Sequence, residues 1–135
     1  MQEKRVIPVT CAILVDAGRR VLVTQRSSLM KLPLKWEFPG GKMERGEGPE
    51  ECLAREIREE LGLEIYIGKR LASSVHHYPD FSIELIPFIC EVRSGRIVLN
   101  EHAAYLWMNA DELPGLDWAE ADVPVLRHYL EFIGK

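Results

Sequence analysis

Three glutamates in the middle of the chain have a spacing that suits metal-assisted chemistry. Glu56, Glu59 and Glu60 lie within an apolar pattern that is typical of a helix, and residues three and four positions apart share one helical face. Three like charges on one face repel each other, whereas a hard cation such as Mg²⁺ takes oxygen ligands and removes that repulsion. The alternative interpretation is a solvated acidic face without a ligand.

A glycine turn and nearby basic residues add the features of a phosphate site. Gly40 and Gly41 follow Pro39, and two adjacent glycines let the backbone turn sharply and pass close to a ligand. Lys42 comes directly after the turn, and Arg26 closes a predicted strand. We interpret both as phosphate contacts, because a triphosphate needs cations in addition to its metal ions. The competing interpretation is a tight turn beside solvated side chains.

The spacing of these residues matches a known motif, the Nudix box G-x5-E-x7-R-E-U-x-E-E-x-G-U, in which U is aliphatic. The segment Trp36–Lys42, which leads into the motif, resembles the mutator-type nucleoside triphosphate pyrophosphohydrolases. The resemblance extends from Val6 to about Tyr129 and points to the branch that includes CTP pyrophosphohydrolases and 8-oxo-dGTP diphosphatases. The fixed positions of the box are Gly41, Glu47, Arg55, Glu56, Ile57, Glu59, Glu60, Gly62 and Leu63.

The resemblance implies a metal site and a catalytic base. It implies Mg²⁺, for which Mn²⁺ can substitute, held by Glu56, Glu59 and Glu60 together with the backbone carbonyl of Gly40. Glu101 is the one acidic residue in its loop, and in related hydrolases a glutamate from this loop reaches the metals or acts as the base. The sequence leaves the choice of base open between Glu59 and Glu101.

The resemblance also gives a supporting role to two charged residues of the motif. Glu47 and Arg55 lie at the two ends of a predicted loop–helix unit. In the family such a pair braces the loop and orients the glutamates, so we expect both to act behind the metal ligands. The competing interpretation is an exposed salt bridge without consequence.

Four residues outside the motif are candidates for contacting the base. One of the aromatic residues Trp36, Tyr78 and Phe81 is interpreted as stacking on it, and core packing is the alternative for each. Asp122 stands where better-known mutator-type members have an asparagine that faces the base, two residues before Pro124. An ionised carboxylate only accepts hydrogen bonds, which favours cytosine and guanine, and protonation would reverse this preference. The competing interpretation of Asp122 is the N-cap of the last helix.

The elements that position these residues follow from hydrophobic periodicity and turn signals. Pro87 inside a predicted strand suggests an edge strand or a bulge. Strands interspersed with two helices predict an α+β class, and the resemblance implies the Nudix fold, a mixed β-sheet sandwiched between helices (α/β/α). The predicted helices are Glu50–Leu61, ended by Gly62, and Val123–Ile133; the predicted strands are Val9–Val15, Val21–Gln25, Trp36–Phe38, Arg70–Tyr78, Ile83–Val92, Ile97–Leu99 and Tyr105–Met108.

Length and composition restrict the class of protein. The 135 residues, 47% of them apolar, fit a single domain over residues 1–135. A net charge of −4 does not favour a polymeric nucleic-acid partner. The charged segment Met1–Arg5 lacks the apolar stretch of a signal peptide, and no apolar run approaches the length of a membrane span. The cysteines Cys11, Cys52 and Cys90 are interpreted as free, buried thiols of a reducing compartment, so we expect a cytoplasmic protein. We also expect a monomer.

The predicted activity is Mg²⁺-dependent hydrolysis of a nucleoside triphosphate, of the CTP or dCTP type or an oxidised guanine nucleotide, to the monophosphate and pyrophosphate. The partner is therefore a small nucleotide. One alternative is a Nudix hydrolase of another diphosphate, such as a nucleotide sugar, a dinucleoside polyphosphate or ADP-ribose. The other is a module that senses a nucleotide without cleaving it. Such modules usually lose box glutamates, and this sequence retains all of them.

Overall fold

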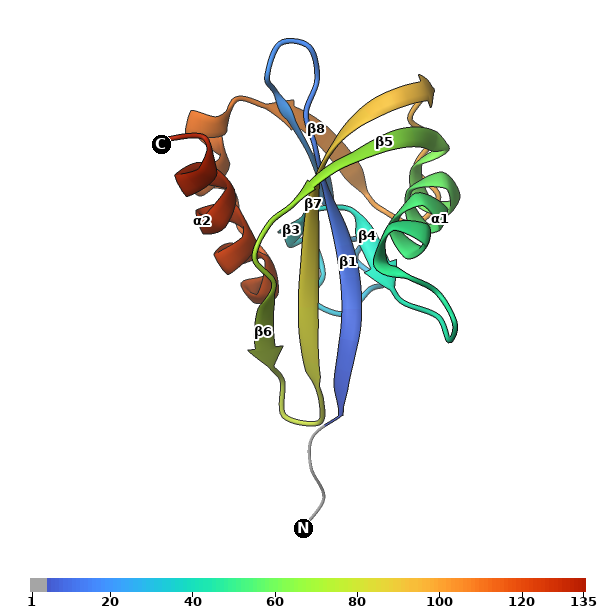
Figure 1. The fold of residues 1–135 in the computed structure, drawn as a ribbon. Coiled ribbons are helices and arrows are strands. Elements are labelled where there is room, and N and C mark those ends of the chain that lie inside the picture. The colour runs from blue at the N-terminus through green and yellow to red at the C-terminus, as the bar shows by residue number, and fades with distance from the viewer. Residues whose placement is uncertain (1–4) are drawn as a thin grey trace.

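Two β-sheets lie between two α-helices in the computed structural model, which describes residues 5–135 (Figure 1). The start of the chain, for which the sequence predicts no signal peptide, lies outside the described residues except for Arg5. The helices are α1 (Pro49–Leu61) and α2 (Val123–Phe132), and the 3-10 segments are η1 (Ala110–Gly115) and η2 (Glu120–Asp122). The strands are β1 (Val6–Leu14), β2 (Val21–Gln25), β3 (Trp36–Glu37), β4 (Gly40–Lys42), β5 (Leu63–Arg70), β6 (Ser74–His77), β7 (Ser82–Gly95) and β8 (Ala104–Met108).

The larger sheet is mixed. Its strand order is β4-β1-β7-β5, and β6 continues the pairing along β7 beyond the end of β5. Strands β1 and β7 run parallel over nine residue pairs, whereas β4, β5 and β6 pair antiparallel with their neighbours. The smaller sheet has the antiparallel order β3-β2-β8. This architecture confirms the predicted α+β class, with a mixed sheet and flanking helices.

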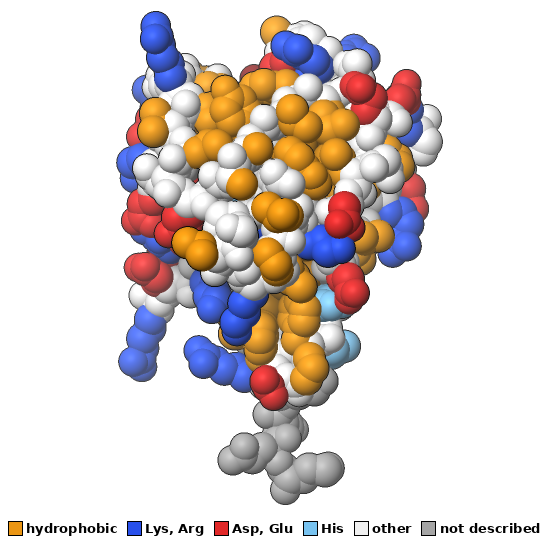
Figure 2. Space-filling view, turned by 180° about the vertical axis from the view of Figure 1, so that it is seen from behind, with side chains coloured by type: hydrophobic (Ala, Val, Ile, Leu, Met, Phe, Trp, Pro, Cys, Tyr) orange, Lys and Arg blue, Asp and Glu red, His pale blue; other side chains and the backbone are white. Residues whose placement is uncertain are grey.

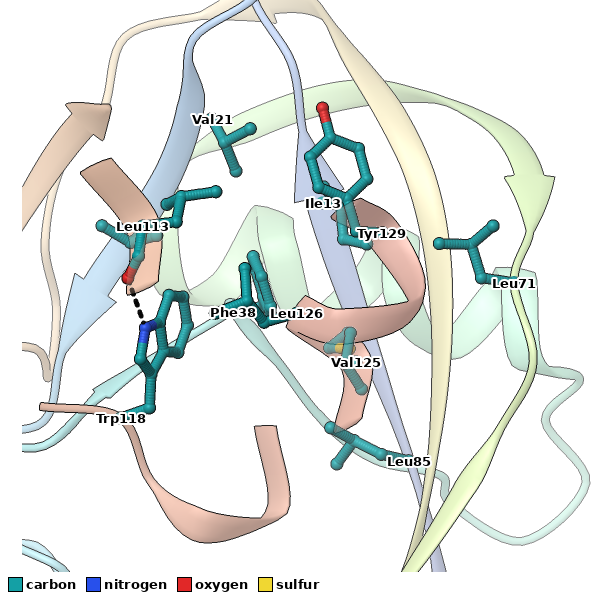
Figure 3. Packing of buried hydrophobic residues seen from close by; sticks show 12 residues of the cluster. Ile13, Val21, Phe38, Leu71, Leu85, Leu113, Trp118, Val125, Leu126 and Tyr129 are labelled. Carbon is teal, nitrogen blue, oxygen red and sulfur yellow. Dashed lines mark hydrogen bonds between the residues drawn. The ribbon is translucent and has the colours of Figure 1, made fainter. Parts of the chain in front are cut away.

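The alternation of side chains along β1 explains why both faces are covered. Cys11 and Ile13 pack into the hydrophobic cluster that contains α2, while Ala12 and Leu14 pack into the cluster that contains α1. Successive side chains of a strand point to opposite faces, so a strand that is apolar at every position requires cover on both. Figure 3 shows the cluster at α2, where Val125, Leu126 and Tyr129 of the helix lie near Phe38 and Trp118.

Local signals set both ends of α1, the helix that carries the acidic residues. Pro49 occupies the first turn, where its missing N–H costs no hydrogen bond. Gly62 ends the helix with φ of 70°, a left-handed conformation that glycine adopts without a steric penalty, and its N–H donates to the Arg58 carbonyl over 3.0 Å. Leu53 and Ile57 are fully buried on one side of the helix, and the glutamates occupy the neighbouring arc of the helix surface.

Two predicted strands differ from the observed ones. The sequence prediction missed β4 and β5. Of the predicted strand Arg70–Tyr78, Arg70 ends β5 and Ser74–His77 forms β6. The segment Ile97–Leu99 is not a strand, so that prediction is wrong. Instead, the Val98 N–H donates to the Leu61 carbonyl over 2.9 Å, and Ile97 and Leu99 pack against the α1 cluster. This segment therefore satisfies the carbonyl end of α1.

Pro87 lies on an inner strand, so its interpretation as a residue of an edge strand is wrong. It belongs to β7, opposite Cys11 of β1. On the other side of β7 the partner changes from β5 to β6, with a register shift between Ile67 and Arg70. The Pro87 carbonyl accepts a hydrogen bond from the Leu71 N–H at this break, over 2.9 Å. Proline has no N–H to donate to a neighbouring strand. The break in pairing that this requires thus lies between β5 and β6, beside Pro87.

Two further observations concern the surface and the cysteines. All three cysteines are buried and unpaired, as the sequence predicts. Within the described residues no helix is long and apolar enough to cross a membrane.

Hydrophobic side chains gather on the upper part of the face seen from behind (Figure 2). Among the apolar side chains exposed to solvent are Tyr105 and Leu106 of β8, which is an edge strand.

Candidate active site

A cavity of about 490 Å³ lies against the glycine turn and the start of η2. We call the part lined by Gly40, Gly41 and Glu60 the acidic end of the cavity, and the part lined by Tyr78, Phe81 and Asp122 the apolar end. Pockets for small ligands have volumes of roughly 300 to 1,000 Å³ and combine apolar walls with a few polar groups. The cavity therefore has the size and lining of a small-molecule site, with one acidic end and one largely apolar end.

Close contacts surround both glycines of the turn, with backbone atoms at Gly40 and with a side-chain carboxylate at Gly41. A Cβ atom on Gly40 would overlap the carbonyl oxygen of Thr10 in the paired strand β1, and one on Gly41 would overlap the carboxylate of Glu56. Below the turn, the buried Thr10 hydroxyl lies 3.2 Å from the Cys52 thiol of α1. The glycines thus let β1, β4 and α1 approach each other more closely than any side chain permits.

The pairing of β4 with β1 fixes the direction of the Gly40 carbonyl. The Ala12 N–H donates to the Pro39 carbonyl over 2.8 Å, and in an antiparallel ladder the next carbonyl along the strand points away from the partner. The Lys42 carbonyl shares the direction of Gly40 and accepts a hydrogen bond from Arg55 Nη2 over 3.2 Å. The Gly40 carbonyl therefore projects from the free edge of the sheet, outside the β1–β4 hydrogen-bond ladder.

Arg55 connects the loop before α1 to the glutamates on the helix. Its Nε and Nη2 atoms bind the two carboxylate oxygens of Glu47 over 2.6 and 2.9 Å. Its Nη1 atom donates to Glu56 over 2.9 Å and to Glu59 over 3.2 Å. The hydrogen bonds from Arg55 lower the pKa of Glu47 to about 2. Because a bidentate pair fixes both partners, this geometry supports the expected bracing role.

Glu60 is directed into the cavity and lacks a counter-charge. Its Oε2 atom is buried and, within residues 5–135, has no hydrogen-bond partner. Burial, followed by the charge of Glu56, raises the pKa of Glu60 to about 9, and the charges of Glu37 and Glu101 act in the same direction. In the described chain, no three Asp, Glu, His or Cys side chains converge as a ready-made metal site. Paired carboxylates with a free buried oxygen nevertheless suit a hard divalent cation.

The other two glutamates predicted to act in catalysis lie near the solvent. The Glu59 carboxylate is largely exposed and accepts its hydrogen bond from Arg55. Glu101 is exposed in the loop between β7 and β8. The Asn100 side chain donates to the Glu59 carbonyl, which ties this loop to the end of α1. The fold thus brings the charge of Glu101 near Glu60, although the two residues are far apart in the sequence.

Glu37 is a site residue to which the sequence reasoning gave no role. It lines the cavity, its Oε1 atom pairs with Arg26 Nη1 over 2.8 Å, and its Oε2 atom lies 2.8 Å from His102 Nε2. The signal was present in the sequence, because a carboxylate between the apolar residues Trp36 and Phe38 in a strand faces the opposite side from both. Arg26, expected to bind phosphate, lines the cavity but is already paired with Glu37.

Asp122 is buried in the cavity wall, and its side chain does not cap α2. Its Oδ2 atom accepts a hydrogen bond from the Phe38 N–H over 2.9 Å, and its side chain makes no capping bond to the helix. Asp122 therefore occupies the predicted N-cap position of α2, but its side chain does not supply the expected capping hydrogen bond. Burial, with a smaller effect from the charge of Glu37, raises the pKa of Asp122 well above its usual value.

The aromatic candidates separate into two groups. Tyr78 and Phe81 both line the cavity, with ring centroids 5.3 Å apart. Trp36 does not line the cavity; it packs against the α2 cluster and bridges to Trp118. The core-packing alternative thus describes Trp36, whereas the other two are placed to contact a ligand. Lys42 is exposed and lines the cavity beside the glycine turn.

Known proteins share this sequence and geometry. Residues 4–129 match the family model described as NUDIX domain. The chain is 32% identical over 126 residues to the CTP pyrophosphohydrolase of Escherichia coli (strain K12), covering 93% of each protein. It is 34% identical over 89 residues to the 8-oxo-dGTP diphosphatase of Proteus vulgaris, covering 66% of this chain and 80% of that one. The solution structure of the E. coli ORF135 protein superposes with a TM-score of 0.84 at 32% identity, covering 97% of this chain and 93% of that chain.

Proposed function

The chain belongs to the NUDIX domain family, and on that premise we propose that this pyrophosphohydrolase cleaves nucleoside triphosphates into a nucleoside monophosphate and pyrophosphate. The observation that carries the proposal is the position of Glu60, whose buried, unpartnered carboxylate oxygen lies at the end of a nucleotide-sized cavity. The adjoining glycine turn, Gly40 and Gly41, lines the same cavity, so its backbone is within reach of a bound phosphate chain. The proposed metal ligands and the phosphate chain of the substrate would therefore lie at the same end of the cavity.

The acidic end of the cavity suits a divalent cation, and we assign Mg²⁺ to it, with Mn²⁺ as a substitute. Glu56, Glu59 and Glu60, with the Gly40 carbonyl, are the proposed ligands, and Glu101 lies close to Glu60. A cation held there neutralises phosphate oxygens and lowers the pKa of a bound water. Lys42, at the edge of the cavity, supplies a further positive charge for the phosphate chain.

One of the glutamates must take the proton of the attacking water. Glu59 is engaged by Arg55 Nη1, whereas Glu101 is exposed and close enough to Glu60 to raise its pKa. We therefore assign Glu101 as the general base and leave Glu59 as a ligand oriented by Arg55. This assignment uses a carboxylate whose oxygens are accessible to the reacting water.

The apolar end of the cavity is the proposed base site. Tyr78 and Phe81 offer aromatic surfaces for stacking, and Asp122 offers a buried carboxyl whose Oδ2 atom is already bound by the Phe38 N–H. A carboxyl in this position distinguishes bases by the hydrogen bonds they offer. We propose cytosine nucleotides or guanine nucleotides, oxidised guanine included, as the preferred substrates. The names of the E. coli and P. vulgaris relatives support this choice.

A substrate panel tests the proposal. Release of pyrophosphate is measured with Mg²⁺ for the common ribo- and deoxyribonucleoside triphosphates and for 8-oxo-dGTP. A nucleotide sugar, ADP-ribose and a dinucleoside polyphosphate are tested in parallel for any cleavage of their diphosphate. We expect the highest kcat/KM for a cytosine or guanine triphosphate. If the nucleotide sugar, ADP-ribose or the dinucleoside polyphosphate is cleaved in preference to every nucleoside triphosphate, the protein has another Nudix activity. If no compound is cleaved, the result indicates a nucleotide sensor.

A further inference from the structure

His102 is a buried residue that follows directly after the exposed Glu101. Its side chain is 1% exposed, and its Nε2 atom lies 2.8 Å from Glu37 Oε2. The other ring nitrogen, Nδ1, is buried and has no hydrogen-bond partner among residues 5–135. The contact with Glu37 is therefore the hydrogen bond that orients this ring, and the adjacent position of Glu101 is tied to it.

The backbone on both sides of this pair is held in place. The Asn100 side chain donates to the carbonyl of Glu59 at the end of α1. The Ala103 N–H donates to the carbonyl of Gln25 at the end of β2 over 2.9 Å. The loop thus spans from the helix of the acidic residues to the smaller sheet, and the His102 side chain provides an anchor between these two fixed points.

Glu37 connects this anchor to the cavity. One of its carboxylate oxygens pairs with Arg26 and the other with His102, while the residue itself lines the cavity. Its charge also raises the pKa of the neighbouring Glu60. A carboxylate held by two partners has little freedom to rotate, because a hydrogen bond to a charged group is stronger than one between neutral groups. His102 belongs to the same loop as Glu101, and its side chain therefore connects this loop to Glu37 in the wall of the cavity.

We infer that His102 is a positioning residue for the reaction, which holds Glu101 over the acidic end of the cavity through its hydrogen bond to Glu37. This inference rests on the proposed function, in which Glu101 is the general base. His102 itself does not touch the substrate in this account. It acts through geometry, since a base displaced by about 1 Å loses much of its effect on the rate.

The test compares His102→Leu with His102→Gln. Leucine fills the space without a hydrogen bond, whereas the glutamine amide reaches Glu37 from about the position of Nε2. We expect kcat at saturating Mg²⁺ to fall about tenfold in the leucine variant, since a hydrogen bond to a charged group is lost, and to recover to within about threefold in the glutamine variant. His128→Leu is the matched control, because His128 on α2 also has a buried Nδ1 without a partner; its kcat should be that of the wild type.

A double-mutant cycle shows whether His102 acts through Glu101. In the Glu101→Gln background the His102→Leu change should lower kcat by less than about twofold further, because coupled residues are not additive. Full additivity, an unchanged kcat in His102→Leu, or an unchanged kcat in Glu101→Gln would each overturn the inference. If His102→Leu does not fold, His102→Asn, which is too short to reach Glu37, replaces it beside His102→Gln. A wild-type protein that releases no pyrophosphate would instead refute the proposed function.

Discussion

The two ends of the cavity are built in different ways. The acidic end comes from one continuous stretch of the chain, in which the glycine turn of β4 is followed by α1 with Glu56 and Glu60. The opposite end is assembled from segments far apart in the sequence, with Tyr78 after β6, Phe81 before β7 and Asp122 before α2. The proposed metal ligands are thus encoded locally, whereas the proposed base Glu101 and the selection of a substrate depend on how distant segments fold together.

The ionisable groups at the two ends also differ in how they are stabilised. Beside the acidic end, Arg55 binds Glu47 through two hydrogen bonds and lowers its pKa to about 2. At the base end, Asp122 is buried, with one hydrogen bond from the Phe38 N–H, and its pKa is raised. The first group remains charged at neutral pH, while the second gains a proton easily. Substitutions at the first end should therefore change the rate, and those at the second should change which base is preferred.

The largest effect is expected for Glu60→Gln. This change keeps the shape of the side chain and removes a proposed ligand charge from the cavity, so kcat should fall at least about a hundredfold while the protein remains folded. The readout is steady-state kcat at saturating Mg²⁺, together with the thermal unfolding midpoint. Glu50→Gln, on an exposed residue in the first turn of the same helix, is the control and should behave as the wild type. A normal kcat in Glu60→Gln would remove Glu60 from the metal site.

An intermediate effect is expected for Arg55→Lys. A lysine keeps the positive charge but cannot bind Glu47 through two parallel hydrogen bonds while also reaching Glu56. We expect kcat to fall about tenfold, because the glutamates lose their orientation. Arg58→Lys is the matched control, since Arg58 on the same helix makes a bidentate pair with the exposed Glu64. Equal kinetic effects of the two substitutions would mean that Arg55 contributes only to the helix and not to the site.

The smallest effect on rate, but a change in selectivity, is expected at Asp122. Its carboxyl is protonated below its raised folded-state pKa and can then donate a hydrogen bond to O4 of uracil. Above that pKa it is ionised and accepts only, as from the amino group of cytosine. The ratio of kcat/KM for CTP over UTP should therefore rise with pH in the wild type, by about fivefold. In Asp122→Asn the ratio should not change with pH.

Protein stability provides an independent check on Asp122. A carboxyl whose folded pKa exceeds the unfolded value loses stabilisation as the pH rises from the unfolded to the folded pKa. Asp122→Asn removes this loss and keeps an acceptor for the Phe38 N–H, so its unfolding midpoint at neutral pH should equal or exceed that of the wild type. A base ranking that is independent of pH in both proteins, with a less stable variant, would restrict Asp122 to a structural role.

The contrast between the two ends also explains what the sequence predicts. The spacing of Glu56 and Glu60 and the end of α1 at Gly62 depend on residues close in the chain, and the structure has the helix with its end at Gly62. The pairing of Glu47 with Arg55 is implied by the family resemblance, and the structure places the two side chains in contact. Helical periodicity and a left-handed glycine are local properties. They do not require knowledge of the tertiary fold.

The contacts that the sequence did not reveal are long-range ones. Asp122 meets the conditions for an N-cap locally, yet its side chain binds Phe38 across the fold. Arg26 forms an ion pair with Glu37 of the neighbouring strand, and Glu37 also contacts His102 in a distant loop. Periodicity indicates which side of a strand a residue faces, but it does not identify the partner on that side. Most buried polar groups are hydrogen-bonded, and the tertiary fold decides which partner each of them meets.

The central claim is that the acidic end of the cavity performs metal-dependent cleavage of a nucleoside triphosphate. The most direct measurement is phosphorus NMR of the products formed from CTP and from 8-oxo-dGTP, with Mg²⁺ and with excess chelator. We expect nucleoside monophosphate and pyrophosphate in the presence of Mg²⁺, no turnover with chelator, and recovery when Mg²⁺ is restored. Turnover that persists in excess chelator, or products that are nucleoside diphosphate and inorganic phosphate, would contradict it.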